Sequence, residues 1–133
     1  MENRLERLVQ ILKNDRFAQH NGIHLASIGI GTAIAEMPVS DNHLNGVNII
    51  QGGALFTLAD FAFAAASNSN GRIAVATNAT ITFFKGISSG KLTAIAKELN
   101  VGKTLSHYSV DIFDQKGTKI AYFTATAFLK GDY

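Results

Sequence analysis

One aspartate inside a long apolar stretch is the side chain of this sequence best placed to do chemistry. Asp60 is the single ionisable side chain between His43 and Arg72, and its immediate neighbours are leucine, alanine and phenylalanine. A carboxylate among apolar residues is costly unless it is hydrogen-bonded or has a function. Service as a general base is one such function. An aspartate on a helix surface, or one held by structural hydrogen bonds, is the alternative that composition alone leaves open.

A pair of glycines lies where a polar loop becomes the helix that carries Asp60. The first N–H groups of a helix lack partners, and the helix dipole adds positive charge there. Gly52 and Gly53 leave room for a ligand next to this backbone. A carbonyl oxygen could be polarised there, as an oxyanion hole requires. A plain tight turn explains the two glycines equally well.

The spacing between Gly53 and Asp60 predicts an assembly of at least two chains. Seven residues are about two helical turns, so both lie on one helix face, roughly 10 Å apart along the axis. That distance is too long for one carbonyl to reach both groups. Two antiparallel copies of the helix at a two-fold interface would bring the glycines of one chain to the aspartate of the other. We therefore expect a homodimer with shared sites.

Two helices are expected in the first half of the chain. Leu5, Leu8, Val9 and Leu12 repeat at helical spacing among charged residues, which predicts an N-terminal amphipathic helix that ends near Arg16. Residues 54–67, rich in alanine, leucine and phenylalanine, predict a buried helix.

The remaining segments read as strands. Residues 23–39 form two extended pieces broken at residues 29–31, and four β-rich segments follow at 73–84, 92–99, 104–113 and 119–129. Short turns between them indicate an antiparallel sheet wrapped on a central hydrophobic helix, an α+β architecture. No linker or repeat divides the chain, so we expect one domain over residues 1–133.

Composition restricts the classes of function. The 133 residues contain no cysteine, which excludes disulfides, thiolate metal sites and a cysteine nucleophile. A net charge of +2 from scattered lysines gives little support for nucleic-acid binding. The first 16 residues do not have the pattern of a signal peptide, and residues 54–66 are too short to span a bilayer, so a cytoplasmic protein without membrane contact is expected. His20 and His24 have no third ligand nearby, and we expect no metal site.

The stretch LNGVNIIQGGALFTLADFAFAAASNSNG, with the later segment KIAYFTATAF, resembles the signature of the hot-dog thioesterases of the phenylacetate-degradation (PaaI) type. The family pattern runs through an asparagine, an HGG turn, an LFxLAD helix and an NSxG exit, and these elements occur here in the same order. The resemblance covers the full length of the chain. It implies a hot-dog fold in which the sheet wraps the central helix.

For the chemistry, the resemblance implies hydrolysis of acyl-CoA thioesters without a cofactor other than the CoA of the substrate. Asp60 would activate water or attack directly, and the Gly53 amide would hold the thioester oxygen. Asn45 would help to orient the group that attacks the thioester carbonyl. The carboxylate comes from the neighbouring subunit in this family, and members usually pair dimers into homotetramers.

Further residues are expected on the substrate side. Gly52 would let the ligand approach the backbone, and Asn68 belongs to the NSxG motif at the end of the central helix. Lys85 is a candidate for contacting a CoA phosphate, and the alternative is an exposed lysine at a strand end. The acyl group would be selected by apolar side chains, among which Phe83 is our first candidate, with Phe56, Phe61, Phe63 and Phe84 as the others.

The sequence departs from the family pattern at two positions. Gln51 replaces the histidine before the two glycines, and because glutamine cannot carry a proton, a positioning role survives while a proton-transfer role is lost. Gly86 follows Lys85 where the family often has proline, which could loosen that loop.

Three functions therefore compete. The first is an acyl-CoA thioesterase acting on medium-length or aromatic acyl groups. The second is a non-catalytic protein that binds or senses acyl-CoA, which Gln51 motivates. The third is a hydroxyacyl thioester dehydratase, which ranks last because Gln51 occupies the position of the histidine it would need.

Overall fold

The computed structural model describes residues 3–132, so residues 1, 2 and 133 of the expected single domain lie outside it. Six strands form one antiparallel sheet in the order β1-β2-β4-β5-β6-β3. Their bounds are β1 His24–Gly29, β2 Thr32–Pro38, β3 Arg72–Phe83, β4 Lys91–Val101, β5 Leu105–Phe113 and β6 Lys119–Asp132. The strand segments expected from the sequence are all present, each with ends shifted by up to three residues.

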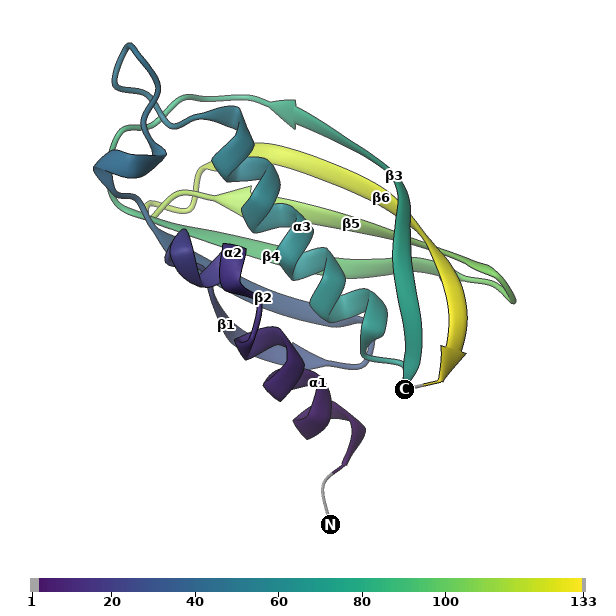
Figure 1. The fold of residues 1–133 in the computed structure, drawn as a ribbon. Helices are drawn as coiled ribbons and strands as arrows, with labels where there is room; N and C mark the ends of the chain where they lie inside the picture. Colours follow the sequence, from purple (N-terminus) through teal and green to yellow (C-terminus); the bar gives the residue numbers. More distant parts are fainter. Residues whose placement is uncertain (1–2, 133) are drawn as a thin grey trace.

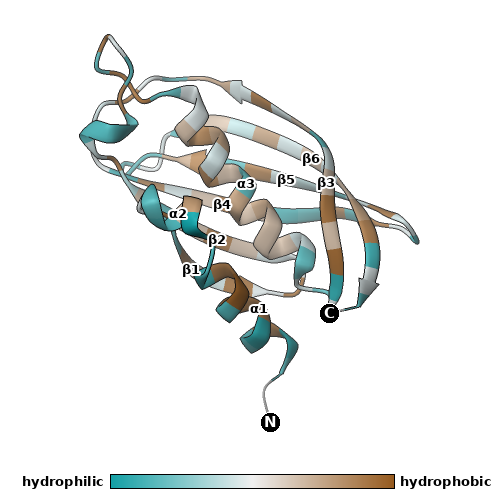
Figure 2. Cartoon of the chain, viewed as in Figure 1, coloured by the Kyte–Doolittle hydropathy of each residue, from teal (hydrophilic) through white to brown (hydrophobic). Residues whose placement is uncertain are grey.

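The sheet wraps around the helix α3, Gly52–Asn68, which crosses its inner face (Figure 1). Small side chains make this close packing possible, because alanines of the sheet such as Ala35, Ala94 and Ala127 are fully buried beneath the helix. Phe63 of α3 fills the middle of the core, with its ring against those of Tyr108 and Phe123. Figure 2 shows α3 in the pale and brown tones of apolar residues over most of its length, as expected for a buried helix.

The N-terminal segment forms two helices where the sequence predicted one that ends near Arg16. Helix α1 spans Arg4–Lys13 and helix α2 spans Arg16–His20. Asp15 separates them because its side chain accepts a hydrogen bond from the N–H of Ala18 (3.0 Å), which is the geometry of a new N-cap. The chain therefore turns at Asp15, and both short helices pack beside α3 and β1 (Figure 1).

The tight turn between β1 and β2 depends on Gly31. Its φ of +75° is in the left-handed region, and a Cβ there would lie 2.8 Å from Oε1 of Glu98. The Gly31 N–H donates to Oγ of Ser69 (2.7 Å), which fastens the hairpin to the end of α3. The break expected at residues 29–31 is thus a turn that only glycine fits without strain.

Strand β3 lies at one edge of the sheet and pairs only with β6 among the described residues. It is long, and apolar side chains such as Ile73 and Val75 are exposed along it. A long edge strand with exposed apolar side chains is a surface on which another chain can pair.

None of the helices within residues 3–132 is long and apolar enough to cross a membrane.

Candidate active site

Asp60 lies on the side of α3 that faces away from the sheet. Asp60 is exposed in the single chain, as are Phe56 one turn earlier and Gly53 two turns earlier. Leucine, alanine and Phe61 on either side turn inward while Asp60 turns outward, so in one isolated chain Asp60 has the helix-surface position that the sequence left open as an alternative. No hydrogen bond or ion pair within residues 3–132 holds the carboxylate.

The pKa of Asp60 is nevertheless raised above the usual value of an aspartate. Partial burial against apolar atoms of the helix surface is the main cause, and the negative charge of Asp15 at the start of α2 adds to it. A carboxylate with no partner and a raised pKa holds a proton more readily than an ordinary surface aspartate, which suits a general base.

The N-terminus of α3 presents the backbone groups that the two glycines were expected to expose. Gln51 is the N-cap residue, and its Oε1 accepts a long hydrogen bond of 3.5 Å from the N–H of Gly53. The main-chain oxygen of Gln51 accepts from the N–H of Ala54 (2.9 Å). Gln51 thus occupies the Gly53 N–H in the absence of a ligand, and a carbonyl oxygen would have to displace a weak contact to bind there.

Gly52 permits a close approach between α3 and the end of β3. A Cβ at Gly52 would lie 2.9 Å from Cζ of Phe83, so the ring of Phe83 lies directly over this glycine. Phe83 is 51% exposed. The structure therefore brings Gly52 and Phe83 together at one open pocket, which Gln51 and Lys85 also line.

Asn45 shapes the loop before α3. Its Oδ1 accepts hydrogen bonds from the N–H groups of Val47 (3.0 Å) and Ile49 (3.1 Å), and an isolated bridge joins Leu44 to Ile50. The loop projects beyond the N-terminal end of α3 (Figure 1). The oxygen of Asn45 is thus committed to the loop, and its amino group is the end of the side chain that could meet a substrate.

His43 is a residue whose importance the sequence did not reveal. Its side chain is buried, Nδ1 accepts from the N–H of Ser40 (3.0 Å), and Nε2 donates to the carbonyl oxygen of Asn21 (2.8 Å). The carbonyl oxygen of His43 in turn accepts from the N–H of Gln51 (2.7 Å). His43 therefore ties the short helix η1, Asp41–His43, to the end of α2 and to the cap of α3. A lone histidine in a polar loop gives no signal of such contacts.

Lys85 lies just after β3 and is half exposed. Its Nζ is 3.7 Å from Oδ2 of Asp114, which makes a loose ion pair. The neighbouring Gly86 lets this loop pack closely on the segment before α3, because a Cβ there would lie 2.8 Å from Ile49. The N–H of Ile50 also donates to the carbonyl oxygen of Ile87 (2.8 Å). The looser loop expected from glycine in place of proline stays a prediction.

Asn68 lies at the opposite end of α3 from the two glycines. Its Nδ2 donates to the carbonyl oxygen of Ala64 (2.8 Å), and its Oδ1 accepts from the N–H of Ala74 (2.9 Å). The oxygen of the amide thus joins α3 to β3, and its amino group bonds back within α3. The structure does not bring Asn68 to the other site residues and gives it a structural role instead.

The five phenylalanines expected to line the acyl site separate into two groups. Phe61 and Phe63 are buried, while Phe56, Phe83 and Phe84 are exposed. The sequence missed Phe17 of α2, which is 65% exposed and lines a hollow together with Gln51 and Gly53. The open side of the site is therefore bounded by rings from α2 and from the end of β3.

Three of the expected site residues, Gly52, Gly53 and Gln51, meet at the start of α3, and Asp60 lies two turns further along the same exposed side. A proton acceptor and a backbone N–H that makes only one long hydrogen bond could activate a nucleophile and polarise a carbonyl group. Within one chain they are too far apart to act on the same carbonyl.

Comparison with known proteins identifies the family of the chain. Residues 47–121 match the family model of the thioesterase superfamily. The acyl-coenzyme A thioesterase PaaI of Escherichia coli is 40% identical over 112 residues, which are 84% of this chain and 80% of that protein. The proofreading thioesterase EntH of Klebsiella pneumoniae is 27% identical over 103 residues, or 75% of each chain.

Solved structures give the same result. The structure of the E. coli PaaI protein from the phenylacetic acid degradation operon superimposes with a TM-score of 0.90 at 34% identity, covering 98% of both chains. A mutant of the PaaI protein of Thermus thermophilus gives a TM-score of 0.83 at 32% identity, covering 86% of this chain and 98% of that one. The resemblance to PaaI-type thioesterases and the hot-dog fold are confirmed. The chain belongs to the thioesterase superfamily, and the expectation that it is a thioesterase is confirmed.

Proposed function

We propose that the protein hydrolyses acyl-CoA thioesters with medium-length or aromatic acyl groups, giving the free acid and CoA, and needs no metal or other cofactor. The observation that carries this proposal is the position of Asp60. It is an exposed carboxylate without a partner among residues 3–132, on the same side of α3 as the free end of the helix at Gly53. The name of the E. coli relative, an acyl-CoA thioesterase, supports the substrate class.

In the proposed reaction, the thioester oxygen accepts a hydrogen bond from the Gly53 N–H and lies at the positive end of the α3 dipole. The Asp60 carboxylate takes a proton from a water molecule as the water oxygen bonds to the carbonyl carbon. The carbon–sulfur bond then breaks, and the CoA sulfur leaves with the electron pair of that bond. Direct attack by Asp60, followed by hydrolysis of the mixed anhydride, would use the same two groups.

Two chains would build each site. Gly53 of one chain and Asp60 of the other would face the same carbonyl, because the two groups of one chain are about two helical turns apart. The unpaired outer edge of β3 and its exposed Ile73 and Val75 support docking of a second copy there. The dimer, its pairing into a tetramer and the cytoplasmic location stay predictions.

The remaining contacts of the substrate follow the open pocket at the start of α3. Phe83 and Gly52 would border the thioester, and Lys85 lies further along the same pocket. Lys85 and Lys116 line the next hollow, where two ammonium groups could meet a CoA phosphate. Asn45 would contact the substrate or the attacking water through its amino group.

The test is release of free thiol from a panel of acyl-CoA esters, from short aliphatic to phenylacetyl and hydroxyphenylacetyl, by the wild type and by Asp60→Asn. Asparagine keeps the size of the side chain and removes the carboxylate. We expect the wild type to turn over part of the panel and the variant to lose at least about a hundredfold in kcat. Equal rates in the two proteins would contradict the role of Asp60.

A non-catalytic acyl-CoA binding protein is the second candidate, and one observation favours it. Oε1 of Gln51 accepts from the Gly53 N–H, so the donor proposed for the thioester oxygen is already in use. A histidine at this position could carry charge, and glutamine cannot. Binding of acyl-CoA without turnover of any ester by the wild type would identify this function.

A further inference from the structure

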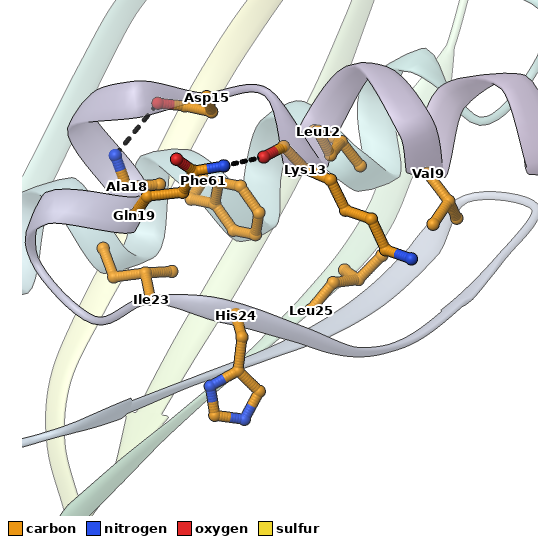
Figure 3. Close-up of a pocket in the computed structure, with 10 residues that line it drawn as sticks. All are labelled: Val9, Leu12, Lys13, Asp15, Ala18, Gln19, Ile23, His24, Leu25 and Phe61. Carbon is orange, nitrogen blue, oxygen red and sulfur yellow. Dashed lines mark hydrogen bonds between the residues drawn. The ribbon is translucent and has the colours of Figure 1, made fainter.

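A second pocket reaches α3 at Phe61, the residue after Asp60, and does not include the start of α3. It is enclosed by α1 and α2 on one side, by the start of β1 on the other and by α3 behind (Figure 3). Its volume is about 430 Å³. That is near the lower end of the roughly 300–1,000 Å³ that small-molecule sites occupy.

The lining of this pocket changes from apolar at the floor to polar at the rim. Leu12, Ala18, Ile23 and Phe61 are buried, and Val9 and Leu25 are partly buried. The polar and charged side chains, all exposed, are Lys13, Asp15, Gln19 and His24. A pocket of this kind accepts an apolar, uncharged group whose polar end stays near the rim.

The walls are held in place by hydrogen bonds, so the pocket exists before any ligand binds. The side-chain amide of Gln19 donates to the carbonyl oxygen of Lys13, which joins α2 to α1 (Figure 3). The N–H of Ile23 donates to the carbonyl oxygen of Ala18 (2.9 Å), which joins α2 to the strand that follows. A preformed cavity costs little ordering when a ligand enters.

The pocket adjoins the proposed nucleophilic group in the same chain. Phe61, which forms part of the floor, directly follows Asp60 in α3, although the two side chains leave the helix about 100° apart. Asp15 at the rim is close enough for its charge to raise the pKa of Asp60. The Asp60 carboxylate therefore lies outside the pocket, near the part of the rim that Asp15 forms.

We propose that this pocket binds the acyl group of the substrate. The carbonyl carbon of that substrate would then lie at Asp60 of the same chain. The pocket selects an apolar acyl group of medium length, and the CoA part extends the other way, toward Gly53 and Lys85 of the second copy. The assignment of the acyl pocket rests on the proposed function. It makes Val9 and Leu25 residues that determine specificity.

Binding of stable thioether analogues tests the pocket separately from turnover. The probes are S-alkyl-CoA compounds from methyl to decyl, titrated calorimetrically into the wild type, Val9→Phe and Ile11→Phe. Val9 lines the pocket, whereas Ile11 is on the same helix, is 53% exposed and does not line it, so Ile11→Phe is the matched control. Each methylene group kept out of an apolar pocket weakens binding about fourfold.

We expect Val9→Phe to bind S-octyl-CoA at least about tenfold more weakly than the wild type does. The affinity of Val9→Phe for S-methyl-CoA should change less than about twofold. The affinity of Ile11→Phe for either probe should also change less than about twofold. Leu25→Phe, which fills the pocket from β1, should reproduce the loss if Val9→Phe is unstable. The proposal is overturned if every variant keeps the chain-length profile of the wild type. Failure of the wild type to hydrolyse the matching esters would instead reject the proposed function, since thioether binding does not depend on turnover.

Discussion

At the scale of single residues, Asp60 shows what a sequence can reveal about a site. Its isolation among apolar residues marked it as unusual, and the ordered motif around it gave the family. The direction of its side chain could not be read from the neighbours, because residues adjacent on a helix point about 100° apart and apolar neighbours can all turn inward. The roles of His43 and Phe17 were also invisible, since both depend on segments brought together by folding.

The raised pKa of Asp60 gives a prediction for the pH dependence of activity. A general base works only when ionised, so kcat/KM should fall as the pH drops through the pKa of Asp60. Asp15→Asn removes the negative charge that helps to raise this pKa, and asparagine remains a good N-cap for α2. We expect the acid limb of the kcat/KM profile to move to lower pH in Asp15→Asn. An unmoved limb would mean that Asp15 does not act on the titrating group.

The same shift makes Asp60 a cost to stability at neutral pH. Because its pKa is higher in the folded than in the unfolded chain, the folded chain binds the proton more tightly, and stability falls as the pH rises between the two pKa values. Asp60→Asn removes this cost. We expect its Tm to exceed that of the wild type at pH 7. The difference should vanish below about pH 3.5, where the carboxyl is protonated in both states. A lower Tm at pH 7 would show that the carboxylate has a stabilising partner in the assembled protein.

At the scale of elements, the sequence predicted the strands and the central helix well. Alternating side chains in β2 and the alanine-rich run of α3 are strong periodic signals, and both segments lie where they were expected. Helix α2 was missed because five residues are too few for a period, and its N-cap Asp15 has the same sequence signature as a turn. The sheet order was not available from local patterns, since β3 pairs with β6 across two intervening strands.

The contact between α3 and β3 at Gly52 yields a prediction of coupling. In Gly52→Ala the new methyl group must displace the ring of Phe83, which is exposed and can move. We expect the free energy of unfolding to stay within about 1 kcal/mol of the wild type, because alanine also favours the helix. The kcat/KM should fall by about tenfold, since the ring moves at the proposed entrance to the thioester site.

A double-mutant cycle checks this coupling. In a Phe83→Leu background there is no ring end for the methyl group to strike, and Gly52→Ala should then lower kcat/KM by less than about threefold. If Gly52→Ala lowers kcat/KM equally in both backgrounds, the new methyl group acts on the ligand directly and not through Phe83.

At the scale of the whole molecule, the proposal that each active site is built from two chains can be tested by complementation. Asp60→Asn lacks the carboxylate, and Gly53→Pro lacks the backbone N–H while proline is tolerated in the first turn of a helix. Each variant alone should be nearly inactive. After the two are unfolded together and refolded, half of the dimers are mixed, and each has one intact site.

We therefore expect the mixture to recover about a quarter of the wild-type activity per site, measured as thiol release. Mixing the folded proteins without unfolding them is the control, since exchange of subunits is then slow. No recovery in mixed dimers, verified by mass spectrometry with differently tagged chains, would mean that both groups act within one chain.

The pairing of β3 with the final strand also affects how the molecule is made. Strand β3 ends at Phe83, but β6, the one strand that pairs with it within residues 3–132, begins at Lys119. During translation at about 5–20 residues per second, β3 waits roughly 2–10 seconds for β6, and longer while β6 clears the ribosome. For that time both of its edges are open, beside α3 with its large apolar surface. The yield of folded enzyme should therefore depend on translation speed over the codons for residues 84–132 more than on any codon before α3.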